Sequence, residues 1–161
     1  MHWRSTLQAS DAGAVGRLVG ATGFFSPEEQ LIAIELVDEA LARGKASGYE
    51  FLFADDPEQA DQLLGYTCFG PIPATRSSFD LYWIAVAPGQ QRQGLGGKLL
   101  RESEKLARQL GATRMFVDTA GRGGYAPTRA FYERMGYHVE ASISDFYAPG
   151  DAKVIYARDL A

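Results

Sequence analysis

The amino-acid sequence predicts a single α/β domain spanning residues 1–161, with a mixed sheet covered by helices on both faces. The chain is long enough for one hydrophobic core but not for two. Hydrophobic residues make up 46% of it and charged residues 22%, as in ordinary globular domains. The spacing of apolar residues alternates along the chain between the helical and the strand period, which indicates that both kinds of element are present.

The first part of the chain predicts a short strand and two helices. We expect the strand at residues 3–8 and a first helix that begins at Ser10 or Asp11. The second helix has the stronger start signal, because Ser-Pro-Glu-Glu at residues 26–29 combines a capping serine, a first-turn proline and a glutamate three residues after the cap. Apolar residues at helical spacing follow, and Gly44 stands where this helix should end.

The remainder of the chain predicts strands interrupted by two helices. The predicted strands are rich in β-branched and aromatic residues and are bounded by proline, glycine or aspartate. The predicted helices cover residues 94–109 and 128–135. Strands are expected at residues 49–54, 63–69, 79–86, 113–119, 137–146 and 153–158. The predicted order is strand, two helices, three strands, helix, strand, helix and two strands. This order is typical of a mixed sheet between helical layers.

Composition and charge favour some partners and argue against others. The net charge of -4 argues against nucleic acid as a partner. No segment is apolar enough to span a membrane, and the N-terminus does not resemble a signal peptide. Cys68 is the single cysteine, and we expect it to be a buried thiol in a reducing, cytoplasmic setting. His2 and His138 lie far apart with no clustered ligands, so we expect no metal site.

One segment carries the features of a phosphate site, since it follows a predicted strand and opens a predicted helix. Unpaired N–H groups and the helix dipole favour an anion there, and glycines let it approach the backbone. A Walker A loop needs serine or threonine, and a dinucleotide fingerprint needs glycine, at the position of Leu99, so both common alternatives fail. The segment suits a pyrophosphate and consists of Gln91, Arg92, Gln93, Gly94, Leu95, Gly96, Gly97 and Lys98.

Two motifs resemble those of the GCN5-related N-acetyltransferase (GNAT) superfamily. Gln91-x-x-Gly94-x-Gly96 after a strand is similar to that family's coenzyme A signature. Phe131-Tyr132-x-x-x-Gly136, followed by an aromatic residue, resembles its later motif. The order of strands and helices is also similar over nearly the whole chain.

The resemblance implies a mostly antiparallel sheet in which one parallel pair of strands, at residues 79–86 and 113–119, splays apart to bind acetyl-CoA as cosubstrate. It implies that backbone groups of Ile84 and Val86 pair with the pantetheine arm. A backbone N–H near Ile84 is expected to polarise the thioester carbonyl. The pyrophosphate is expected on residues 92–97.

The implied activity is direct transfer of the acetyl group to a primary amine, which we expect to belong to a small molecule. The attacking amine must be neutral, and Asp80 is the candidate general base, although a solvated carboxylate is an equal interpretation. Tyr132 matches the position whose hydroxyl protonates the departing thiolate. The alternative is a non-catalytic acyl-CoA-binding sensor or regulatory module, which would not need Tyr132. By analogy with the family, a homodimer is a further expectation.

The acceptor side is the least determined part of the prediction. Residues 24–26 and 145–147 are expected to wall it, because aromatic and acidic groups suit a cationic amine. Tyr125 stands where many relatives carry an asparagine that holds the pantetheine, so no coenzyme contact is assigned to it.

Overall fold

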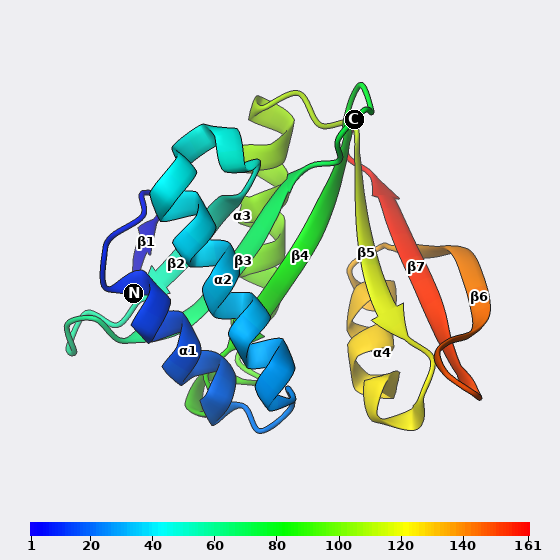
Figure 1. Ribbon diagram of the computed structural model, residues 1–161, viewed down its shortest axis with the longest axis horizontal. Helices are drawn as coiled ribbons and strands as arrows, with labels where there is room; N and C mark the ends of the chain where they lie inside the picture. Colours follow the sequence, from blue (N-terminus) through cyan, green and yellow to red (C-terminus); the bar gives the residue numbers. More distant parts are fainter.

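A twisted sheet of seven strands in the order β1-β2-β3-β4-β5-β7-β6 forms the centre of the computed structural model, which describes residues 1–161 (Figure 1). Every neighbouring pair is antiparallel except β4 and β5, which are parallel. This confirms the predicted mixed, mostly antiparallel sheet with one parallel pair. The strands are β1 (His2–Arg4), β2 (Glu50–Asp55), β3 (Leu63–Pro71), β4 (Ser78–Val86), β5 (Arg114–Ala120), β6 (His138–Ala148) and β7 (Asp151–Asp159).

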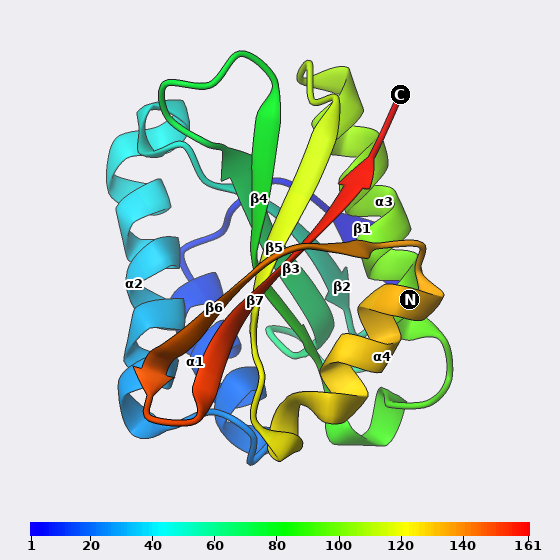
Figure 2. The same ribbon diagram turned by 90° about the vertical axis from the view of Figure 1, so that its right-hand side faces the viewer.

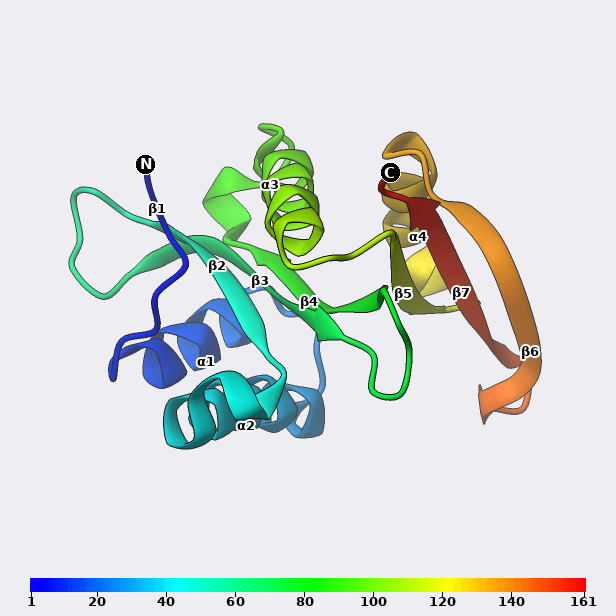
Figure 3. The same ribbon diagram turned by 90° about the horizontal axis from the view of Figure 1, so that it is seen from above.

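Helices cover both faces of the sheet, as predicted. Two of them, α1 and α2, pack on one face of β2–β4, whereas α3 and α4 lie on the other face (Figures 2 and 3). The Ser26 side chain and the Glu29 side chain form the predicted capping box at the start of α2. The helices are α1 (Asp11–Ala21), α2 (Pro27–Arg43), α3 (Leu95–Gln109) and α4 (Ala126–Arg134).

Most predicted elements are found within a few residues of their expected bounds. The opening strand is the clearest exception, because it ends at Arg4 instead of continuing to residue 8. Residues 5–8 instead lead into α1, where the Gln8 N–H donates to the carboxylate of Asp11 at 2.7 Å. Local hydrogen bonding by Asp11 therefore competes with the predicted continuation of the strand. Cys68 is fully buried, as expected.

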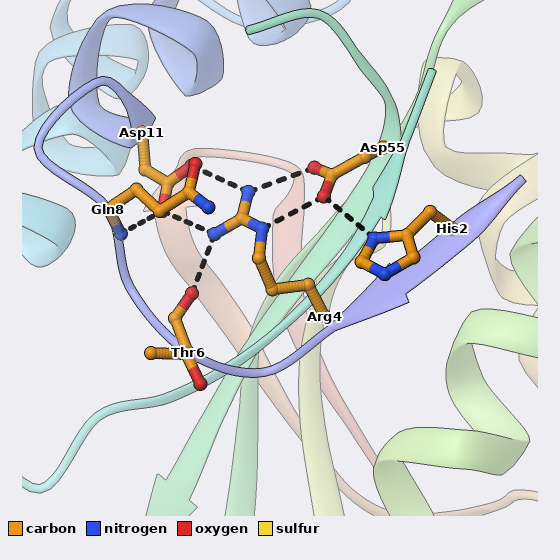
Figure 4. Close-up of polar contacts among 6 residues, drawn as sticks. All are labelled: His2, Arg4, Thr6, Gln8, Asp11 and Asp55. Carbon is orange, nitrogen blue, oxygen red and sulfur yellow. Dashed lines mark hydrogen bonds and ion pairs between the residues drawn. The ribbon is translucent and has the colours of Figure 1, made fainter. Parts of the chain in front are cut away.

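The N-terminal strand is fixed by one guanidinium group (Figure 4). Arg4 makes bidentate hydrogen bonds to Asp11 and to Asp55, with all four N···O distances between 2.8 and 2.9 Å. It also donates to the Thr6 carbonyl, and His2 adds a longer contact to Asp55. These bonds join β1 to the start of α1 and to the end of β2.

The parallel strands β4 and β5 are joined over a short length only. Their paired residues are Ser78–Asp80 with Arg114–Phe116. Beyond this point the strands diverge, and Figure 1 shows the sheet opening into a V. One buried cluster lies beneath α1 and α2. A second runs beneath α3 and α4 from β3 and β4 across to β5 and β7, so that it joins the two arms at the closed end of the V.

A β-bulge in β4 lies beside this opening. Cys68 pairs with Trp83 and Phe69 with Leu81, so that Tyr82 has no partner on β3. As a result, Tyr82 and Trp83 both pack toward the core beneath α1 and α2. Bulges re-aim side chains in this way near functional sites.

No helix combines the length and the apolar composition needed to cross a membrane. The outermost strand, β6, is solvent-exposed along its whole length and includes exposed Val139, Ile143, Phe146 and Tyr147.

Candidate functional site

The opening between β4 and β5 forms a cleft of about 820 Å³. Its walls come from the α1–α2 connection, strand β4, the loop before α3, strand β5 and helix α4. Several segments far apart in the sequence therefore converge on one space, as is typical of small-molecule sites.

The loop before α3 presents an array of free backbone donors at one end of the cleft. The first hydrogen bond of α3 runs from the Lys98 N–H to the Gly94 carbonyl, at 3.1 Å. None of the N–H groups of residues 92–97 makes a well-formed hydrogen bond within the protein. Together with the helix dipole, these donors form an anion site of the predicted kind.

The conformation of this loop is specialised for exposing those donors. Gly94 has φ 81°, a left-handed value that favours glycine, and the non-glycine Arg92 also has a positive φ of 64°. A Cβ atom at Gly96 would lie 3.5 Å from Phe131 and 3.7 Å from Val86. A side chain larger than a methyl group at Gly96 would therefore crowd Phe131 and Val86, which line the cleft beside the free amides.

The edge of β4 that faces the cleft has no partner strand after Asp80. Ala87 N–H donates to Leu64 O on the β3 side, at 2.8 Å. Since backbone groups alternate in direction along a strand, those of Ile84 and Val86 point into the opening. The Val86 carbonyl accepts a hydrogen bond from Gln91 Nε2 at 3.2 Å, which agrees with this orientation. A ligand that lies along β4 can pair with this edge as an additional strand would.

The predicted loop residues divide into those that line the cleft and those that do not. Leu95 is buried in the core with Leu52 and Leu99. Gln93 is exposed and its amide donates to the Gly89 carbonyl, and Lys98 is also exposed. The predicted residues that line the cleft are Ile84, Val86, Gln91, Arg92, Gly94, Gly96, Gly97 and Tyr132.

Tyr132 reaches the cleft from α4 and is 3% exposed. The rings of Tyr137 and Tyr156 pack around it, with centroids at 5.6 and 6.1 Å. Its hydroxyl has no hydrogen-bond partner in the protein, and burial raises its pKa above the usual value. The hydroxyl is therefore held in its protonated form, free to donate to a ligand.

Asp80 does not line the cleft, but it lies at the apex of the V, where β4 still pairs with β5. Its neighbours Phe79 and Leu81 are in the core beneath α3 and α4, so its side chain faces the opposite side of the sheet. Burial, together with the charge of Asp118, raises the pKa of Asp80 to about 6. A carboxyl group with this pKa can exchange protons near neutrality.

Of the two segments predicted to wall the acceptor side, only one lines the cleft. Phe24 and Phe25 line the cleft, whereas Ser26 caps α2. Residues 145–147 lie outside the lining: Asp145 accepts from the Gly150 N–H, and Phe146 packs under the Lys153 ammonium at 4.6 Å. The side chains of Asp145 and Phe146 therefore form contacts within the β6–β7 hairpin.

Sequence reasoning missed several lining residues, among them Glu29, Trp83, Asp118 and Arg134. The sequence identified Glu29 only as a helix-capping residue and did not indicate that it lines the cleft. Asp118 could have been found, because it is the one acidic residue in the strand that flanks the predicted opening.

A second, smaller cavity of about 230 Å³ lies beside Arg4. The carboxylates of Asp11 and Asp55 in its wall are already paired with the Arg4 guanidinium. Its central charged groups are therefore already engaged with one another.

Comparison with known proteins places this chain in a family. The model of the acetyltransferase (GNAT) family matches residues 21–137. A GNAT-family protein from Desulfovibrio desulfuricans is 47% identical, with a TM-score of 0.94 and 99% of each chain covered. Among proteins of curated function, none matches significantly.

More distant solved structures share the fold alone. An aminoglycoside 6'-N-acetyltransferase in complex with coenzyme A is 14% identical, with a TM-score of 0.77 over 100% of this chain and 98% of that one. Ribosomal-protein-alanine N-acetyltransferase from Brucella melitensis is 18% identical, with a TM-score of 0.75 over 99% of both chains. The family match extends over most of the sequence, and it agrees with the splayed parallel strands and the free donors before α3. The chain therefore belongs to the acetyltransferase (GNAT) family.

Proposed function

We propose that this protein transfers the acetyl group of acetyl-CoA directly to a primary amine of a small molecule. The observation that carries the proposal is the continuity of the cleft. It runs from the free amides of residues 92–97, along the open edge of β4, to the unpartnered hydroxyl of Tyr132. These three features match the pyrophosphate, the pantetheine amide groups and the thioester sulfur of one extended cosubstrate.

In the proposed reaction, the amine nitrogen attacks the thioester carbonyl carbon while a backbone N–H near Ile84 stabilises the developing oxyanion. The carbon–sulfur bond then breaks, and the Tyr132 hydroxyl gives its proton to the thiolate. Burial raises the pKa of Tyr132 and so keeps its hydroxyl protonated until a thiolate forms beside it. Asp80 accepts the proton lost by the amine, through water, because it does not line the cleft itself. Tyr132 is later reprotonated through water by the proton that Asp80 takes from the amine.

Calorimetric titration with acetyl-CoA tests the binding step without knowledge of the acceptor. Gly96→Glu should weaken binding by about 100-fold or more, because the new side chain fills the anion approach and repels phosphate. Gly89→Glu is a charge-matched control in the same loop, since a Cβ there meets nothing within 4 Å and its amide lies outside residues 92–97. If the wild type fails to bind acetyl-CoA, or if both variants bind normally, the proposal is wrong.

Asp80→Asn should slow turnover by about 100-fold near neutral pH, the size of a typical general-base effect. The ratio of wild-type to variant kcat/KM should be constant above about pH 7 and should decline as Asp80 protonates below its pKa of about 6. Use of this ratio cancels the titration of the amine substrate. A ratio that does not change with pH would remove Asp80 from the mechanism.

The same substitution should stabilise the folded protein. Since the folded-state pKa of Asp80 lies above the unfolded value, ionisation of Asp80 favours the unfolded chain. Asp80→Asn should therefore raise Tm at neutral pH, and the gain should vanish as the pH falls below about 4, where both states of the wild type are protonated. Thermal unfolding across this range measures the difference.

The alternative is a non-catalytic acyl-CoA-binding module. It shares the amide array and the β4 edge but needs no proton donor at the sulfur. The buried and unpartnered Tyr132 hydroxyl favours the enzyme.

A further inference from the structure

The charged side chains that line the cleft are divided by sign. Arg92 and Arg134 come from the loop before α3 and from α4, on one side of the sheet. Glu29 comes from the first turn of α2, on the other side. Asp118 also faces that side, because its neighbour Val117 is in the core beneath α3 and α4. One end of the cleft is therefore suited to anions and the opposite end to cations.

Aromatic rings form a continuous wall on the acidic side. Phe25 packs against Trp83 at 4.6 Å between centroids, Phe24 against Phe25 at 5.1 Å, and Phe24 against Tyr125 at 5.1 Å. All four residues line the cleft. Rings of this kind accommodate both the hydrocarbon part of an amine and an ammonium group over a ring face.

Glu29 is the one lining carboxylate without a cationic partner. Asp118 pairs with Lys153 at 3.2 Å, and the nearby Arg122 pairs with Asp151 at 2.9 Å. Glu29 has one hydrogen bond, from the Ser26 N–H at 3.0 Å. Its negative charge is therefore available to a ligand.

A lining carboxylate does not help the reacting amine itself. That nitrogen must be neutral when it attacks, and a nearby negative charge would favour its protonated form. A fixed charge on the cleft wall is useful when it binds a different positive group of the same molecule and so positions the neutral nitrogen.

We propose that the acceptor is an aliphatic amine with a second ammonium group, and that Glu29, with the rings of Phe24 and Tyr125, binds this second group. The inference rests on the proposed function, since it names the acceptor class for the same cleft. Acceptors with a carboxylate close to the second ammonium are disfavoured, because Glu29 would repel it. Tyr125 thereby has a role on the acceptor side instead of the coenzyme side.

Calorimetry on the coenzyme A-saturated protein tests the assignment with putrescine and with butylamine, a monoamine of equal chain length. We expect putrescine to bind at least about 10-fold more tightly than butylamine to the wild type. Glu29→Gln should abolish this preference, because glutamine keeps the capping-box hydrogen bond but not the charge. Glu28→Gln is the matched control, since Glu28 lies in the same helical turn, is exposed and does not line the cleft.

The outcomes separate this inference from the proposed function. If the protein binds coenzyme A but binds the two amines equally, the second-cation site is wrong and the proposed function stands. Equal effects of the two substitutions would lead to the same conclusion. Absence of coenzyme A binding would overturn the proposed function and this assignment with it. With turnover as readout, the kcat/KM ratio of putrescine to butylamine should fall in Glu29→Gln and remain unchanged in Glu28→Gln.

Discussion

Arg4→Met should lower the free energy of unfolding by about 3–5 kcal/mol, the usual cost of removing one partner from a buried ion pair. The Asp11 side chain is 2% exposed and relies on the Arg4 guanidinium for compensation of its charge. Asp55 would lose two hydrogen bonds at the same time. Methionine fills similar volume, so the loss reports the charge more than the packing.

Urea denaturation of Arg4→Met, Asp11→Asn and the double variant measures this effect. The double variant should lose less than the sum of the single variants, because it no longer buries an unpaired carboxylate at residue 11. A loss below about 1 kcal/mol for Arg4→Met would show that this cluster is not a major source of stability. Strict additivity would show that Arg4 and Asp11 are not coupled.

The effect of Arg4 should also depend on pH. Arg4 lowers the pKa of Asp55 in the folded state, so this pair adds stability above the unfolded-state pKa. That contribution is lost as the pH falls through the folded pKa. The gap between wild type and Arg4→Met should therefore narrow below about pH 4.

Tyr132→Phe should reduce kcat by about 100-fold to 1,000-fold and leave acetyl-CoA affinity nearly unchanged. Phenylalanine keeps the packing against Tyr137 and Tyr156, and the hydroxyl has no protein partner to lose. The deficit therefore reports the interaction with the leaving sulfur. Steady-state kinetics at saturating acceptor, with acetyl-CoA affinity from calorimetry, separate the two quantities.

Tyr137→Phe is the matched control for Tyr132→Phe. It removes a hydroxyl from the adjacent ring, but this one donates to Glu104 at 2.9 Å and does not line the cleft. Its effect should appear mainly in stability. Normal turnover by Tyr132→Phe, or equal rate losses in both variants, would exclude a proton-donor role for Tyr132.

The sequence predicted those features that depend on local rules. The capping motif at residues 26–29, the strand before the phosphate loop and the free amides that follow it depend on residues close together in the chain. The parallel pairing of β4 with β5 is not local, and it was predicted from the resemblance to a family. The early end of β1 was missed although its cause is local, because the bond from the Gln8 N–H to the Asp11 carboxylate competes with strand pairing.

The acceptor side was harder to predict because it is formed by segments that are distant in the sequence. Phe24 and Tyr125 lie on opposite arms of the V, and nothing in the sequence indicates that their rings meet. The bulge at Tyr82 depends on the register with β3, and it shifts the direction of side chains by one position. Glu29 has a complete local explanation as a capping residue, which concealed its position in the cleft.

The short junction between β4 and β5 has a consequence for the lifetime of the protein in a cell. Only three residue pairs join the two arms within the sheet, so the empty molecule should open locally along the diverging part of β4 and β5 more often than within its buried core. A ligand that spans the arms adds about 2.7 kcal/mol when present at 100 times its Kd. Because proteases act on opened forms, the protein should be degraded faster when its ligand is scarce. Its abundance would then follow metabolic supply without any change in gene expression.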